Sequence, residues 1–328
     1  MLLLFWLSAV AAISIEAIAL VLLLWRRKQR GKLRTAIVAL LAAFEMPMLA
    51  FAGYLGWMWL GPQPPSEVIQ IAQGVAYRRV VETEFRGRQT FHVVVIDLDF
   101  ARPAWVSTPL IQLDDGRLGH KTQTAHAFAK QTGADVAINA SFFGPADPGD
   151  RPLGFRLIPG AEVVPAWGTV MDGRFIDAPA TEQARPINLY QANDNGPPRV
   201  VFGPLDTSAD VAVSGGNDYV FGDQTWRFGD DEPRPRAAAG LNADGHLVLV
   251  VLDGQQPRYS HGMTEPEFAQ WLRDYGLIKA VSLDGGGSAQ LVARIDGELR
   301  TLNRPMQGTI PKLARPVANF IALDLPGP

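Results

Sequence analysis

The residue types and spacing best suited to chemistry occur at residues 282–288, which read SLDGGGS. An apolar stretch ends here in Asp284 and is followed by three glycines and a serine: Gly285, Gly286, Gly287 and Ser288. Because glycines let backbone N–H groups converge and let a ligand approach closely, such a bend can hold an anion. The alternative interpretation is a hairpin, since Asp-Gly is the strongest short hairpin signal. A hairpin needs only two turn residues, however, whereas this motif has three glycines and a serine.

A second motif lies at residues 138–144, which read INASFFG. Asn139 ends a short apolar strand, and Phe142 and Phe143 come shortly after it. Aromatic faces suit a sugar ring, and an amide can bind its hydroxyls. The alternative is a pair of core phenylalanines after a strand, which is the better interpretation of this motif alone.

Several other polar and glycine residues indicate function more weakly when each is taken alone. Arg236 precedes a strand that could lie beside the strand leading to Asp284. Asp253 follows the apolar run 247–252, although Asp-Gly is again also a turn signal. His261 could carry a proton near neutral pH, but a lone exposed histidine is more often incidental. A small glycine loop adds Gly215 and Gly216.

Taken together and in this order, the motifs resemble the phosphodiester glycosidase family over roughly residues 122–323. The segments that look like the family's elements are 139–143, 236–240, 253–254 with 262–264, 283–288, and finally Arg315, Val317 and Asn319. The order and spacing of several elements are far more specific than any one of them. The sequence departs from the family pattern at Ala140, Ala237 and Gln255. If those positions touch substrate, the substrate or the activity has changed.

The resemblance implies a hydrolase that cleaves the glycosidic bond of a sugar-1-phosphodiester or a related cell-envelope glycan. Such a bond breaks through an oxocarbenium-like state, and a phosphate leaving group departs without strong protonation. We therefore expect Asp284 to act as the catalytic carboxylate, the glycines and Arg236 to hold the phosphate, and Asn139 and Ser288 to orient the substrate. The other candidates for substrate binding are Phe142, Phe143, Gly215, Gly216, Asp253, His261 and Arg315.

Two other classes of function stay open at this point. A non-catalytic glycan-binding module, tethered to a membrane, would keep the aromatic pair and the glycine bend but would need no carboxylate. A partner-recruiting membrane protein would depend instead on Glu16 and Glu45, which interrupt the apolar N-terminal runs.

The composition limits the chemistry further. The 328 residues include no cysteine, which excludes disulfides, thiolate zinc sites and a cysteine nucleophile. The net charge of −3 and the lack of a basic block beyond the N-terminal region argue against a nucleic-acid partner. His120 and His126 have poor spacing for a shared metal, so we expect no metal and no cofactor. A structural calcium ion is left open, at the acidic loop residues Asp147, Asp150 and Asp172.

The N-terminal residues 1–60 differ from the rest of the chain. Residues 2–25 and 36–60 are apolar runs with few interruptions, and the basic loop 26–34 separates them. Each run exceeds the ~20 residues that a membrane-spanning helix needs. Positive charge favours the cytoplasmic side, so the pattern predicts a transmembrane hairpin in the lipid bilayer of a bacterial inner membrane, with the N-terminus and the C-terminal domain outside, in the periplasm. A cleaved signal peptide is the rival, but it carries its positive charge before a shorter apolar run.

The predicted fold class is α+β: the two-helix transmembrane hairpin, then a linker at 61–66 (GPQPPS), then a strand-rich mixed α/β domain at 67–328. Helices are expected at 122–132 and 264–275, the second opened by a capping box. The principal expected strands lie at 75–81, 91–98, 134–139, 247–252, 278–283, 289–294 and 317–323. The sequence leaves the oligomeric state open.

Overall fold

The computed structural model describes most of the chain after residue 60 and scattered residues before it. The described residues are 13–14, 18, 31, 39, 43, 46–54, 56–57, 61–83, 87–147, 158–177, 184–194, 196–216, 219, 232–308 and 310–326. Two compact units make up the chain. One is Met1–Pro62 with Thr309–Pro311, and the other is Gln63–Gly308 with Lys312–Pro328.

The transmembrane hairpin predicted for residues 1–60 is wrong. No helix in the described part of the chain is long and apolar enough to cross a membrane. The longest described helical run before residue 61 is 46–54, whereas a span needs ~20 residues in one helix. The predicted inner-membrane location, with the C-terminal domain outside, is wrong on the same finding. Glu16, Glu45 and the basic loop 26–34, apart from Gly31, lie outside the described residues.

Strands dominate the larger unit. The described strands are β1 Glu67–Ala72, β2 Val75–Glu82, β3 Gln89–Ile96, β4 Ala104–Trp105, β5 Ile111–Gln112, β6 Leu118–Lys121, β7 Val136–Asn139, β8 Phe143–Pro145, β9 Glu162–Pro165, β10 Thr169–Met171, β11 Arg174–Ile176, β12 Arg185–Tyr190, β13 Arg199–Phe202, β14 Val211–Gly215, β15 Arg236–Asn242, β16 Leu247–Leu252, β17 Leu277–Leu283, β18 Leu291–Ile295, β19 Glu298–Thr301, β20 Met306–Gln307, β21 Ile310–Pro311 and β22 Phe320–Asp324. The described helices after residue 60 are α3 Leu98–Ala101, α4 Ala125–Thr132, α5 Glu265–Asp274 and the 3-10 turn η1 Gly286–Ser288.

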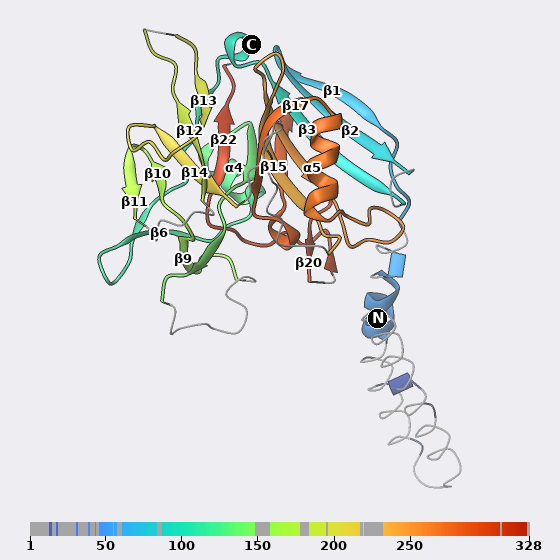
Figure 1. Ribbon diagram of the computed structural model, residues 1–328. Helices are drawn as coiled ribbons and strands as arrows, with labels where there is room; N and C mark the ends of the chain where they lie inside the picture. The colour runs from blue at the N-terminus through green and yellow to red at the C-terminus, as the bar shows by residue number, and fades with distance from the viewer. Residues whose placement is uncertain are drawn as a thin grey trace. The chain divides into compact units, whose positions relative to one another are not determined.

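The strands form several antiparallel sheets (Figure 1). A six-stranded sheet has the order β1-β2-β3-β16-β15-β17, and a five-stranded sheet has the order β19-β18-β7-β22-β4. Two further sheets are described. One has five strands in the order β11-β10-β14-β12-β13, and the other has four in the order β5-β6-β9-β8.

β16 explains how the layers pack. Its sequence LVLVVL is apolar throughout because both of its faces are buried. Leu247, Leu249 and Val251 face a core shared with the two five-stranded sheets. Val248, Val250 and Leu252 face a second core, formed with α5. Period-two alternation thus sends alternate residues of a continuous apolar strand into different cores.

The two longer helices cover opposite outer faces. α5 packs on the six-stranded sheet through Phe268, Ala269 and Leu272, and it starts with a capping box between Thr264 and Glu267. α4 packs on the β7–β22–β18 face through Ala125, Phe128 and Ala129, which share one helical face. Figure 1 shows α5 lying across the strands of the first sheet.

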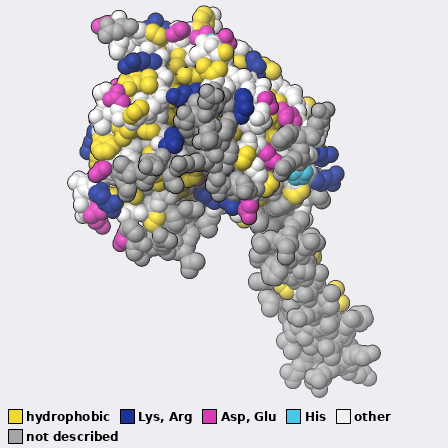
Figure 2. Space-filling model, viewed as in Figure 1, with side chains coloured by type: hydrophobic (Ala, Val, Ile, Leu, Met, Phe, Trp, Pro, Cys, Tyr) yellow, Lys and Arg dark blue, Asp and Glu magenta, His cyan; other side chains and the backbone are white. Residues whose placement is uncertain are grey.

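The surface carries charges of both signs. On the face in Figure 2, the Lys and Arg side chains of the described residues are interspersed with Asp and Glu side chains and with apolar ones. This mixture agrees with 30 basic and 33 acidic residues in the whole chain.

We expect replacement of Phe128 with Ala to destabilise the domain by about 3–5 kcal/mol, because it removes a fully buried ring. The Phe128 ring stacks on Phe320 with centroids 4.5 Å apart. The matched control is Phe100→Ala, whose ring is 56% exposed, and we expect it to change stability by less than about 1 kcal/mol. Urea unfolding measures both, and equal losses in the two variants would contradict the assignment of this core.

Candidate functional site

The candidate site forms where several strands end at one edge of the six-stranded sheet. β15 runs antiparallel between β16 and β17, with Arg236 opposite Leu252 and Ala237 opposite Leu283. Asp253 and Asp284 therefore leave the sheet at the same edge, on either side of the start of β15. Two strand spacings place their backbones about 10 Å apart.

The glycine run after Asp284 forms a tight turn. The N–H of Gly286 donates to the Pro235 carbonyl at 2.8 Å, and the N–H of Ser288 donates to the Gly285 carbonyl at 3.1 Å. Gly286 has a φ of 58°, a conformation that favours glycine. In the described part of the chain, neither the Gly285 N–H nor the Gly287 N–H donates to a backbone carbonyl in a turn, loop or cap. Asp284 and the three glycines are partly exposed, so this nest can meet a ligand.

Arg315 brings a positive charge to the nest. Its Nη1 donates to the Ser288 hydroxyl at 3.3 Å, and its Nε donates to Gln307 Oε1 at 2.8 Å. A Cβ on Gly287 would lie 2.6 Å from Arg315 Nη2 and 2.7 Å from Gln307 Oε1, so any larger residue here would displace the ends of these two side chains. A guanidinium beside a glycine turn is an arrangement suited to phosphate.

Asn139 is fully buried and holds the backbone on both sides of the nest. Its Nδ2 donates to the Asp284 carbonyl at 2.6 Å, and its Oδ1 accepts from the Gln290 N–H at 2.9 Å. The Asp284 N–H donates in turn to the Ala140 carbonyl at 2.9 Å. Both ends of the Asn139 amide thus bind backbone, which gives this residue a positioning role.

The two phenylalanines after Asn139 separate. Phe142 is half-buried and meets Trp167 edge to face, with centroids 5.4 Å apart. Phe143 is buried in the core beneath α4, which agrees with the alternative interpretation of this residue as a core phenylalanine.

The glycine loop after β14 reaches the end of β17. A Cβ on Gly215 would lie 2.2 Å from the Ser282 carbonyl oxygen, and one on Gly216 would lie 2.9 Å from the Phe142 ring. The Gly216 N–H also donates to the Ser282 carbonyl at 3.0 Å. Both glycines therefore allow close packing beside the site.

Arg236 lies beside the nest, where its Cδ is 3.9 Å from a Cβ built on Gly285, and its predicted role in holding the phosphate stays a prediction. The side chain is buried, and its Nε and Nη2 donate to the carbonyls of Met263 and Glu232, each at 2.9 Å. Its Nη1 lies 3.7 Å from Glu265 Oε1. The backbone beside it supports the turn, because Pro235 accepts from Gly286.

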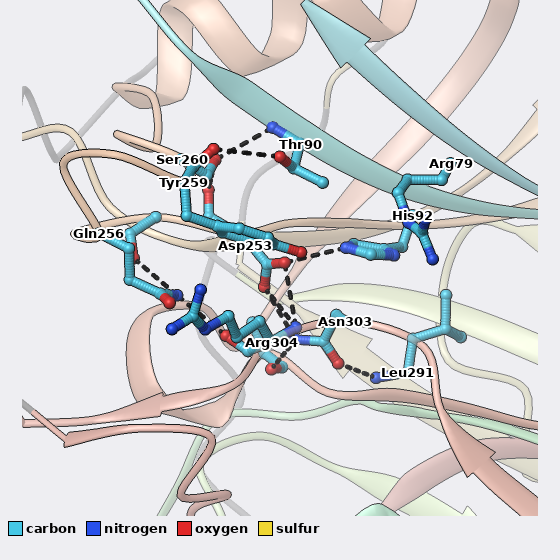
Figure 3. Close-up of polar contacts among 12 residues, drawn as sticks. Arg79, Thr90, His92, Asp253, Gln256, Tyr259, Ser260, Leu291, Asn303 and Arg304 are labelled. Atoms are coloured by element: carbon cyan, nitrogen blue, oxygen red, sulfur yellow. Dashed lines mark hydrogen bonds and ion pairs between the residues drawn. The ribbon is translucent and has the colours of Figure 1, made fainter. Parts of the chain in front are cut away.

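Asp253 is buried within a polar network, drawn in Figure 3. Its carboxylate accepts from the Arg304 N–H at 3.0 Å and from Asn303 Nδ2 at 3.2 Å, and lies 2.9 Å from His92 Nε2. His261 packs its ring on Gly87, in the turn between β2 and β3. That turn lies at the same sheet edge but about three strand spacings, roughly 14 Å, from β17.

The metal-binding candidates do not converge. Among the residues that the structure describes, no three His, Cys, Asp or Glu side chains could hold one metal ion, and Asp150 lies outside those residues. His120 is buried, and burial lowers its pKa to about 4, so its neutral ring donates from Nδ1 to the Pro109 carbonyl at 3.0 Å. The expectation of no metal and no cofactor stays a prediction.

Several residues around the site carry no signal in the sequence. Gln307 reaches the nest from β20, Gln290 follows it by two residues, and His92 contacts Asp253 from within the mostly apolar strand β3. Trp167, beside Phe142, follows no recognisable motif. These contacts depend on tertiary structure.

Comparison with known proteins supports one family. Residues 132–323 match the model of the phosphodiester glycosidase family. The chain is 35% identical over 106 residues to an SPbeta prophage-derived protein of Bacillus subtilis, covering 27% of this chain and 16% of that protein. It is 40% identical over 57 residues to mouse N-acetylglucosamine-1-phosphodiester alpha-N-acetylglucosaminidase, covering 17% of this chain and 11% of the enzyme. The matches thus span a small part of these relatives.

Two solved structures share the fold. A putative exported protein of Burkholderia pseudomallei superposes with a TM-score of 0.58 at 15% identity, covering 80% of this chain and 98% of that one. The zebrafish N-acetylglucosamine-1-phosphodiester alpha-N-acetylglucosaminidase catalytic domain, auto-inhibited by its pro-peptide, gives 0.51 at 18% identity, with 81% and 92% covered.

We expect Gly287→Ala to weaken the binding of inorganic phosphate by about tenfold, because the new methyl group displaces the Arg315 guanidinium from the nest. Isothermal titration calorimetry measures the dissociation constant. The control is Gly203→Ala, where a Cβ meets open space and the backbone is not left-handed. Equal affinities in the two variants, or no binding by the unmodified protein, would refute the anion site.

Proposed function

The chain belongs to the phosphodiester glycosidase family, and from that membership we propose that it hydrolyses the glycosidic bond of a sugar-1-phosphodiester. The observation that carries the proposal is the partly exposed residue Asp284, at the tip of β17, next to a glycine nest and a guanidinium. A sugar-1-phosphodiester needs both parts: an anion cradle and, beside it, a carboxylate facing the anomeric carbon.

The nest and Arg315 would hold the phosphate. Arg315 already touches Ser288 and lies against Gly287, so its charge is fixed at the turn before a ligand arrives. Preorganised donors of this kind stabilise charge that develops in the transition state without further reorganisation. Here that charge develops on the phosphate oxygen that leaves the sugar.

Asp284 would act at the sugar. Water attacks C1 and forms the new C–O bond, while the C1–O bond to phosphate breaks and its electron pair stays on the phosphate oxygen. A carboxylate beside C1 stabilises the cationic character of C1 or accepts the proton of the attacking water. Because a phosphate monoester has a second pKa of ~6, it leaves without a strong general acid.

Phe142 and Trp167 offer an aromatic surface at the site. Their edge-to-face contact fixes the Phe142 ring, and Gly216 lies against it. A partly exposed, immobilised ring suits the apolar face of a sugar. We assign this pair to sugar binding.

The departures from the family pattern fall at positions of different character. Ala140 and Ala237 are buried, and Ala237 packs in the largest core, so these two changes concern packing. Gln255 is exposed with a φ of 57°, in the turn after Asp253. The carboxylate, the three glycines and Ser288 of the nest are all retained.

We expect Asp284→Asn to lower turnover of a sugar-1-phosphodiester by at least about 100-fold, because the amide neither stabilises the cation nor accepts a proton. A panel of hexose-1-phosphate alkyl diesters, followed by release of the phosphomonoester, measures it. Phosphate affinity should not fall, because the nest is unchanged and the substitution removes a negative charge that repels the anion.

The matched control for this test is Asp244→Asn, an exposed aspartate in the turn between β15 and β16. It should retain full turnover. Full activity of Asp284→Asn would remove Asp284 from the mechanism. Tight glycan binding by the unmodified protein with no turnover of any diester would favour a non-catalytic binding module.

A further inference from the structure

A second aspartate at the same sheet edge has an environment opposite to that of Asp284. Asp253 is 1% exposed, and donors converge on its carboxylate from three segments of the chain. They are the Arg304 N–H, Asn303 Nδ2, His92 Nε2 and the Tyr259 hydroxyl. Figure 3 shows the carboxylate of Asp253 at the centre of these side chains.

This environment excludes direct chemistry by Asp253. A general acid or base must come within hydrogen-bond reach of the substrate. Asp253 is closed off from solvent, and its oxygens are already occupied by donors from the chain itself. Its role must therefore be exerted through the groups that it holds.

The orientation of the network follows from its two tyrosines. Burial is the main cause that raises the pKa of Tyr77 and also that of Tyr259, so both keep their protons. Tyr77 can then donate to His92 Nδ1, 2.8 Å away, which leaves His92 Nε2–H to donate to Asp253. Every proton in the series points toward the carboxylate.

The groups held by Asp253 lead back to the nest. Asn303 donates to the Ala289 carbonyl at 3.1 Å and accepts from the Leu291 N–H at 2.9 Å, so it clamps the chain just after Ser288. Arg304 precedes β20, where Gln307 accepts from Arg315 Nε. Asp253 thus fixes the segment that orients Arg315.

We propose that Asp253, held by His92 and Tyr77, is a positioning residue for the phosphate-binding guanidinium of Arg315. The proposal rests on the proposed function, in which Arg315 binds the phosphate of the substrate. It gives a role to a buried polar network that the chemistry at Asp284 does not use.

The test is Asp253→Asn, which keeps the shape but turns one acceptor oxygen into a donor that faces other donors. We expect KM for a hexose-1-phosphate alkyl diester and the Kd for inorganic phosphate each to rise about tenfold, as for a lost charge-assisted contact. We expect kcat to fall by less than about threefold, because Asp284 is unchanged. Tyr77→Phe removes the hydroxyl that donates to His92, which in turn contacts Asp253. It should raise KM and the phosphate Kd by about twofold to threefold.

The control is again the exposed Asp244→Asn, which should leave all three constants unchanged. Should Asp253→Asn not fold, the Tyr77→Phe result decides. An active protein whose Asp253→Asn form keeps the original KM and phosphate Kd overturns the inference, even if its melting temperature falls. A lower kcat at unchanged KM overturns it too.

The two proposals fail in different ways. If the unmodified protein turns over no sugar phosphodiester, the proposed function fails. The phosphate Kd of Asp253→Asn, compared with that of the unmodified protein, still decides the positioning role, because it needs no turnover.

Discussion

The site depends on the buried amide of Asn139, which joins two sheets at the point where the nest begins. Asn139 ends β7 in one sheet, and the Asp284 carbonyl that it binds follows β17 in another. Its other end accepts from Gln290, beyond the nest. The side-chain amide supplies a donor and an acceptor on separate atoms, and a buried backbone group left unpaired costs about 1–3 kcal/mol. The backbone of Asp284 is thus placed by a residue that need not touch the substrate.

The same local motif, an Asp-Gly pair after an apolar strand, has two different roles at this edge of the sheet. Asp253 and Asp284 each follow an apolar strand and each precede glycine, so the sequence around them offers little to tell them apart. The fold separates them: Asp253 is enclosed by donors, whereas Asp284 stays partly exposed beside the nest. Environment decides which carboxylate can meet a substrate and which can only hold structure, as in other enzymes with paired carboxylates.

The sequence allowed the strongly patterned elements to be predicted. β16 was predicted at its observed bounds, because an apolar run between turn residues has few other interpretations, and α5 within a residue or so, because of its capping box. The tight turn after Asp284 was predicted from its glycines, and its binding of an anion stays a prediction. The contacts of Gln307 and His92 were not, since they follow from pairing of distant segments. The prediction of a transmembrane hairpin failed because it treated apolar sequence alone as evidence for a membrane-spanning helix.

Arginine shows most clearly why position in sequence does not give a role. Arg236 lies nearest to the nest in the sheet register, yet two carbonyls and Glu265 hold its guanidinium. A buried cation needs such partners, because desolvation costs several kcal/mol without them. Arg315 comes from the far end of the chain and lies against Gly287, where an added Cβ would push its guanidinium aside. The register therefore brings the backbone of Arg236 to the turn, whereas Arg315 reaches the turn through its side chain.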